Sequence, residues 1–194
     1  MAAKDPSYFK SIPLEQEIQQ KELRFHLYMF QHYGLNQTDV AHASRPNSFG
    51  HTIAHDWTIR EEPSLKARVV AHAQGLHLSA GMDEENWFIC FNIVFADERF
   101  EASTLKVLGA LTSEKDGEWA IIGGTGEFAF SQGVVKYSKI SDANGYCIRE
   151  LHLRALCLTF PKPVYREEGK CRQLEFWLEK EQTLETYSAL LQKS

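Results

Sequence analysis

The chain has few of the features that mark nucleic-acid-binding or membrane-spanning proteins. Its 21 Lys and Arg are outnumbered by 26 Asp and Glu, which gives a net charge of -5 and leaves no basic surface for nucleic acid or for acidic phosphorylated substrates. No apolar run approaches the roughly 18 residues that a membrane span needs. The first twenty residues also lack the apolar stretch of a secretory signal. We therefore expect a cytoplasmic protein that binds neither nucleic acid nor membrane.

Cysteine is scarce, and the four cysteines are separated by long, irregular gaps without a CxxC pair. This spacing predicts reduced, partly buried thiols. His51 and His55 lie four residues apart on a predicted strand and therefore share a face. The sequence offers no third ligand at metal spacing, and the commoner catalytic zinc sites use three. We predict surface histidines and no metal site.

The most informative segment runs from Trp119 to Tyr137 and contains Gly123-Gly124-Thr125-Gly126. A phosphate-binding loop would need Lys and Ser or Thr after the last glycine, and a dinucleotide-binding loop would open a helix. Glu127 and Phe128 follow instead, and the apolar residues continue to alternate. The pattern predicts a strand, a tight turn and a second strand, and it argues against nucleotide binding.

Short alternating segments recur along most of the chain. The first begins near Glu22, and residues 31–47 form a predicted loop with few large apolar side chains. Further strands are predicted at residues 49–55, 68–78, 87–95, 103–108, 119–122, 127–137 and 146–160. Several short strands without helical stretches among them indicate an all-β protein, an antiparallel barrel or a sandwich.

Four motifs together resemble the dirigent protein family of plants: SFGHTIAHDWTI (48–59), AHAQGLHL (71–78), STLKVLGA (103–110) and the glycine hairpin. Their order and spacing match over residues 23–158. The resemblance implies an eight-stranded antiparallel β-barrel of the dirigent and allene-oxide-cyclase-like kind, assembled as a homotrimer. We expect an N-terminal arm (1–20), the barrel domain (21–160) and a C-terminal extension (161–194). Apolar residues near one face predict a helix over 170–194.

Dirigent proteins bind phenoxy radicals that a separate oxidase makes, and they direct which carbons join. The resemblance therefore implies no redox cofactor, an external oxidase as partner and catalysis by placement. An eight-stranded barrel has room for packed side chains or one small ligand. A pocket would open at one end, rimmed by loops 31–47, 79–86 and 110–118.

The resemblance also implies which positions line this pocket, and most of its ionisable groups are replaced here. Gln31 and Leu111 stand where coupling members carry Asp, and His77 and Ser79 stand where they carry Tyr. His72 replaces an Arg, and a second Arg falls at Gly117 or Glu118.

Two acidic residues and one histidine complete the candidate ligand-binding set. Asp56 matches a family Asp after the second strand, and Glu127 follows the glycine hairpin. Either side chain could line the pocket mouth or cap a turn. His77 is the candidate for proton transfer because a free imidazole has a pKa near 6.5. A hydrogen-bonded interior histidine, or one that points outward, is the structural alternative.

Two functions follow from these features. The first is an auxiliary plant defence protein that binds a small phenolic ligand and guides stereoselective coupling without being an oxidase itself. The second is a non-catalytic module that binds carbohydrate or recruits a partner, because the chain resembles the signal-less dirigent domains of grass dirigent–jacalin chimeras. Exposed rings such as Trp57, Trp87 and Trp119 would then stack on sugars.

Overall fold

The computed structural model describes residues 18–43, 48–84, 86–112 and 114–159. Nearly all of them form strands, joined by short turns. The strands are β1 (Gln19–His32), β2 (Gln37–Ala41), β3 (Thr52–Arg60), β4 (Val69–Ser79), β5 (Asn86–Phe95), β6 (Thr104–Thr112), β7 (Asp116–Thr125), β8 (Gln132–Ala143) and β9 (Tyr146–Thr159). Two short 3-10 turns lie between strands, η2 (Glu98–Phe100) and η3 (Gly126–Phe128).

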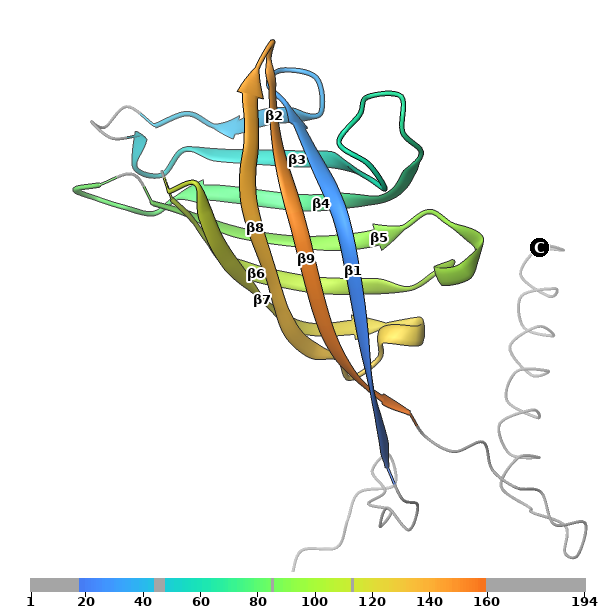
Figure 1. Cartoon of the computed structure of the whole chain (residues 1–194). Coiled ribbons are helices and arrows are strands. Elements are labelled where there is room, and N and C mark those ends of the chain that lie inside the picture. Colours follow the sequence, from blue (N-terminus) through green and yellow to red (C-terminus); the bar gives the residue numbers. More distant parts are fainter. Residues whose placement is uncertain (1–17, 44–47, 85, 113, 160–194) are drawn as a thin grey trace, which may run out of the picture. The chain divides into compact units, whose positions relative to one another are not determined.

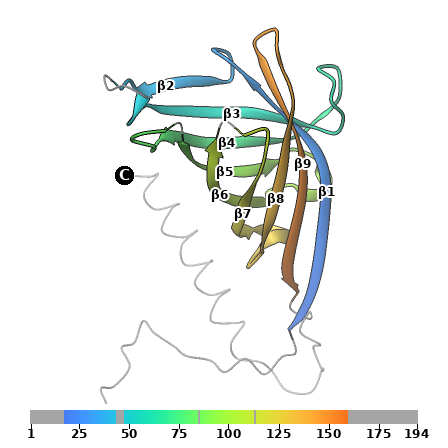
Figure 2. The same ribbon diagram turned by 60° about the vertical axis from the view of Figure 1, so that its left-hand side comes forward.

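The strands form one closed antiparallel barrel. Their order is β1-β9-β8-β7-β6-β5-β4-β3-β2, and β1 also pairs with β3, where Met29 faces Ile59. This last pairing closes eight strands into a ring, and β2 pairs with residues 52–55 of β3, along the same edge of β3 that β1 takes at residues 58–60. Figures 1 and 2 show β1, β8 and β9 crossing β3, β4 and β5 at a steep angle, as expected for a strongly twisted closed sheet. The predicted eight-stranded antiparallel barrel is confirmed.

The alternation of buried and exposed side chains along each strand determines which residues fill the interior of the barrel. Along β9, Leu151, Leu153 and Ala155 are buried, whereas His152 and Arg154 between them are exposed. The same period of two places Trp57 of β3 and Trp119 of β7 in the core, each at most 1% exposed. Because successive side chains of a strand point to opposite faces, one parity fills the lumen and the other faces outward.

The glycine motif differs in detail from the predicted tight turn. Gly123 and Gly124 still pair with β6, and the chain reverses only at η3, where Gly126 has a φ of +61°. A Cβ on Gly124 would lie 2.3 Å from the carbonyl oxygen of Phe128, so the returning chain packs directly on this glycine. Strand β8 therefore begins at Gln132 and not at Glu127 as predicted.

The predicted N-terminal arm is only partly described, and the whole predicted C-terminal extension over 161–194 lies outside the described residues. Residues 1–17 of the predicted arm and the predicted helix over 170–194 lie outside the described residues. Gln19 and Gln20 belong to β1 and pair with Thr159 and Leu158 of β9. The predicted loop 31–47 contains the short strand β2. In the described ranges, no helix has the length and apolar character needed to cross a membrane.

Candidate functional site

A cavity of about 420 Å³ opens at the end of the barrel where β1, β4 and β6 finish and β3, β5 and β9 begin. Side chains from eight strands and from the segments next to β1 and β3 surround it, so the barrel closure itself creates the site. Its lining residues are Gln31, Tyr33, Gln37, His51, Ile53, His77, Trp87, Leu111, Thr112, Lys139, Asp142 and Arg149.

Four large polar side chains are buried inside this end of the barrel: Gln31, His55, His77 and Arg149. Each is at most 7% exposed. They come from β1, β3, β4 and β9, and each shares the inward parity of its strand. We call these four residues the lumen cluster. Buried polar groups are costly unless they are hydrogen-bonded, so their partners define the site.

One part of the lumen cluster is a chain of hydrogen bonds. The Nη1 of Arg149 donates to Gln31 Oε1 at 2.9 Å, and Gln31 Nε2 donates to Gln37 Oε1 at 3.0 Å. The indole Nε1 of Trp57 donates to the same Gln37 oxygen at 3.1 Å. Strand β2, which carries Gln37, thus fixes the orientation of the Gln31 amide and, through it, the guanidinium.

The other part is a pair of histidines. His55 Nδ1 and His77 Nδ1 lie 3.1 Å apart, so one nitrogen donates and the other accepts. The His55 ring stacks on Trp57 with centroids 3.8 Å apart, and His77 meets Trp87 edge to face. Burial and the neighbouring His77 lower the pKa of His55 to about 3, and burial and the Arg149 charge lower the pKa of His77 to about 4. Both imidazoles are therefore neutral at pH 7.

The structure brings together half of the residues that the sequence singled out. Gln31, His77 and Leu111 line the cavity. Ser79 lies two residues beyond His77 on the same face of β4 and is 1% exposed. The predicted proton-transfer residue, His77, does lie on the cavity wall, but its lowered pKa makes it a neutral hydrogen-bonding group at pH 7.

Three other predicted residues lie on the outside of the barrel. Asp56 and His72 face each other across β3 and β4, where His72 Nδ1 lies 2.7 Å from Asp56 Oδ1. Glu118 is exposed on β7, opposite Lys136 of β8. All three have the outward parity of their strands, so none of them lines the cavity.

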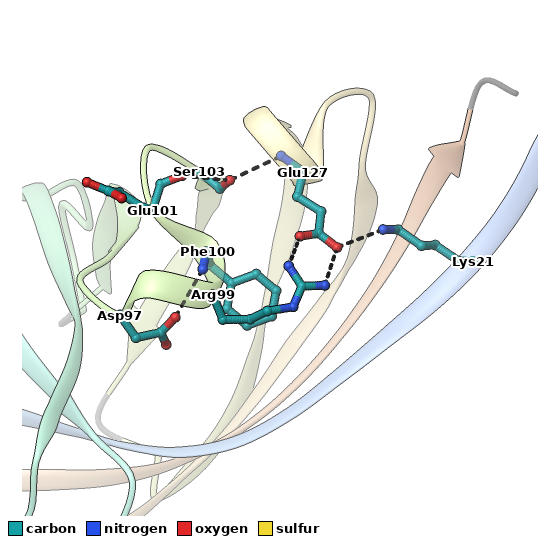
Figure 3. Close-up of polar contacts among 7 residues, drawn as sticks. All are labelled: Lys21, Asp97, Arg99, Phe100, Glu101, Ser103 and Glu127. Atoms are coloured by element: carbon teal, nitrogen blue, oxygen red, sulfur yellow. Dashed lines mark hydrogen bonds and ion pairs between the residues drawn. The ribbon is translucent and has the colours of Figure 1, made fainter. Parts of the chain in front are cut away.

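Glu127 lies at the opposite end of the barrel from the cavity. Its Oε1 accepts hydrogen bonds from Lys21 Nζ at 2.9 Å and from Arg99 Nη2 at 2.8 Å, and Arg99 Nη1 reaches Oε2 (Figure 3). Its backbone N–H donates to Ser103 Oγ at 3.1 Å. Lys21 and Gln31 are ten residues apart on β1, which corresponds to about 30 Å. Glu127 joins η3 to η2 and β1 and is remote from any ligand in the cavity.

Several residues of the site were not predicted as ligand-binding: Arg149, His55, Gln37 and Lys139. Arg149 was detectable, because it shares the parity of Leu151 and Leu153 on the apolar face of β9. The role of Gln37 was not detectable, because it depends on a five-residue strand within a polar segment.

His51 and His55 do not act as a pair, although they share a face as predicted, and the prediction that both are surface histidines is wrong for His55, which is buried. His51 Nε2 lies 2.8 Å from Asp39 Oδ1, whereas His55 turns to His77. Asp39, His42 and His51 form a group of three metal-capable side chains, and His26, Glu150 and His152 form another on the outer face of β1 and β9. A hollow of about 490 Å³ beside His26 and His152 is larger than the cavity, but it lies on the outer face of β1, β8 and β9. The barrel cavity is the better candidate because its polar groups are buried and converge.

Comparison with known proteins supports the same fold. A sequence model of the dirigent-like proteins matches residues 22–156. Pterocarpan synthase 1 of Glycine max is 36% identical over 87 residues, which cover 44% of this chain and 47% of that protein. Dirigent protein 11 of Arabidopsis thaliana is 38% identical over 101 residues, which cover 48% of this chain and 51% of that protein. The chain thus spans about half the length of these curated relatives.

Solved structures of two relatives match this chain over a longer stretch than the sequence comparisons do. A pterocarpan synthase dirigent protein superposes with a TM-score of 0.68 at 25% identity, over 81% of this chain and 92% of that one. A second pterocarpan synthase dirigent protein gives a TM-score of 0.64 at 26% identity, over 74% of this chain and 98% of that one. The closed barrel, the match over 22–156 and these relatives together show that the chain belongs to the dirigent-like protein family.

Proposed function

We propose that the protein binds a small phenolic ligand in the barrel cavity and guides the stereochemistry of its coupling or of a related reaction. The radical would come from an external oxidase, because family members of this kind steer radicals that other enzymes make. Support comes from the family, and from relatives whose names describe them as pterocarpan synthases and dirigent proteins. The observation that carries the proposal is the cavity of about 420 Å³, because small-molecule sites typically measure roughly 300–1,000 Å³.

The cavity wall suits an aromatic ligand. The wall includes the Trp87 ring and the Ile53 and Leu111 side chains, and several of the polar groups beside them are held in place by hydrogen bonds to other side chains. A ring held between these apolar groups would have one face blocked, so that one approach geometry is favoured over the others. We propose placement, and not proton transfer, as the source of selectivity.

The carbohydrate-binding alternative depended on exposed flat rings. Trp57 and Trp119 are buried in the core, and Trp87 belongs to the cavity wall. These positions favour a ligand inside the barrel over a sugar stacked on its surface. Trimer formation, which the family resemblance implies, is a separate part of the proposal that light scattering would test.

A coupling assay tests the function. Coniferyl alcohol is oxidised by a laccase with and without the protein, and the products are separated on a chiral column. We expect an enantiomeric excess that depends on protein concentration. Leu111→Phe fills the cavity and should reduce the excess, whereas the matched substitution Ile122→Phe on the exposed outer face of β7 should not. A racemic product with the folded wild-type protein would contradict the proposal.

A further inference from the structure

The guanidinium of Arg149 is a buried positive charge without a carboxylate partner. Its side chain is 7% exposed, and Nη1 donates to the neutral amide of Gln31. In the part of the chain that the structure describes, no carboxylate lies within ion-pair distance of this guanidinium. Its Nε is also buried without a hydrogen-bond partner there. Burying a charge is expensive unless it is paired, so this position predicts an anionic partner.

The surroundings add positive charge to the same wall. Lys139 of β8 is directly paired with Arg149 in the strand register and also lines the cavity. Asp142 lines the cavity too, but its carboxylate lies 3.7 Å from the Lys139 ammonium and is 47% exposed. The two positive charges, of Arg149 and Lys139, exceed the one negative charge of Asp142, so the wall carries one net positive charge. A concave site with low-dielectric walls strengthens such a field.

Gln31 explains why the charge is not compensated within the protein. The family resemblance puts a carboxylate at this position, and an amide keeps the hydrogen bond to Arg149 without cancelling its charge. The His55 and His77 rings are neutral at pH 7 and cannot supply a negative charge. The remaining source of an anion is the ligand.

We infer that the cavity binds a small aromatic acid whose carboxylate accepts hydrogen bonds from Arg149 while its ring packs near Trp87 and Leu111. This inference rests on the proposed aromatic ligand and adds its charge class. A guanidinium presents a planar fork of donors that matches the two oxygens of a carboxylate. A phenol with a pKa near 10 is neutral at pH 7, whereas a carboxylic acid with a pKa near 4 is ionised, so the carboxylate is the anion expected.

Three probes separate the carboxylate from the phenol: ferulic acid, coniferyl alcohol and cinnamic acid. Ferulic acid and coniferyl alcohol share one phenolic ring and differ in carboxylate against hydroxymethyl, and cinnamic acid has the carboxylate without the phenol. Isothermal titration calorimetry at pH 7 with the full chain should show ferulic acid binding about 10- to 100-fold more tightly than coniferyl alcohol, the range for charge-assisted hydrogen bonds.

Two variants of Arg149 test the assignment. Arg149→Gln should bring the affinity ratio of acid to alcohol to about 1, and Arg149→Lys should keep part of the preference because it retains the charge without the fork. Arg154→Gln, an exposed arginine on the outer face of the same strand, is the matched control and should keep the full ratio. Thermal melting of each variant confirms that it is folded.

Equal affinity of the wild-type protein for ferulic acid and coniferyl alcohol would overturn the anion site and leave the phenolic proposal intact. A preference for the acid that survives in Arg149→Gln would also overturn it. Binding of cinnamic acid that depends on Arg149, without binding of coniferyl alcohol, would support the anion site and contradict the phenolic proposal. Failure of all three probes to bind would contradict both.

Discussion

Substitution of Glu127 by Gln tests what stabilises the end of the barrel opposite the cavity. Arg99 and Lys21 lower the pKa of the Glu127 carboxyl from 4.5 to about 2. If the whole shift were stability, it would contribute about 3 kcal/mol. Arg99 is 65% exposed and Lys21 38%, so solvent screens both pairs and about 1–2 kcal/mol remains. We expect Glu127→Gln to lower the free energy of unfolding at pH 7 by this amount.

The effect of pH on this difference has a definite sign. Because the folded-state pKa of Glu127 is below its unfolded value, the carboxylate contributes its stability in full above pH 4.5 and loses it as the pH falls towards 2. The difference in free energy of unfolding between the wild type and Glu127→Gln should therefore be constant from pH 7 to pH 5 and should become smaller from pH 4.5 to pH 3. Urea denaturation followed by tryptophan fluorescence measures it at each pH.

A matched substitution distinguishes the ion pairs from the loss of any surface carboxylate. Glu118→Gln changes an exposed carboxylate on β7 for which no ion pair is found among the described residues, and it should alter stability by less than about 0.5 kcal/mol. Added salt at 1 M should shrink the Glu127 effect, because the screening length falls to about 3 Å. A Glu127→Gln variant as stable as the wild type at pH 7 and low salt, or a gap that does not change with pH, would refute the argument.

Two further predictions concern the lumen and the glycine motif. Because the unfolded chain binds protons near pH 6.5 that the buried His55 and His77 do not accept until about pH 3–4, stability should fall by about 2–3 kcal/mol between pH 7.5 and pH 5.5. Urea denaturation at several pH values should show this decrease in stability in the wild type, and the decrease should be absent in the double variant His55→Gln/His77→Gln. Gly124→Ala should lower stability by about 1–3 kcal/mol, because the new methyl group would meet the Phe128 carbonyl oxygen, whereas at Gly123 the nearest atom is 3.9 Å away and Ala should be tolerated. Equal thermal melting temperatures for the two alanine variants would contradict this account of the motif.

The fold was predictable because its main signal is local. Alternation along β1 and β9 and the glycine motif indicated paired strands, and the family resemblance selected a closed barrel over a sandwich. The glycine motif was located correctly, but its turn was not, since the reversal depends on Phe128 inserting into the core after Gly126. Strand β2 was missed because it is short and largely polar and pairs with β3 alone.

The sequence could predict residues of the site only where the alternation along a strand decides whether a side chain faces the lumen. Gln31, His77 and Leu111 face the lumen because they share the parity of buried neighbours. Glu127 could not be assigned from its position after the motif, because its partners Arg99 and Lys21 are 28 and 106 residues away in the sequence. Such pairs are set by barrel closure, which a local pattern does not encode.

The lumen cluster limits what chemistry this cavity can perform. His55 and His77 are neutral at pH 7 and have no proton on a charged ring to donate, Gln31 has no acidic proton, and a guanidinium does not release one. The one carboxylate among the described lining residues, Asp142, is at the rim and beside Lys139. A reaction that needs a buried acid would therefore be slow here, whereas one that needs only two partners held in a fixed orientation would not. The stereochemical outcome of the proposed coupling should then depend on the shape of the wall around Trp87 and on the charge of Arg149, and it should vary little with pH between 6 and 8.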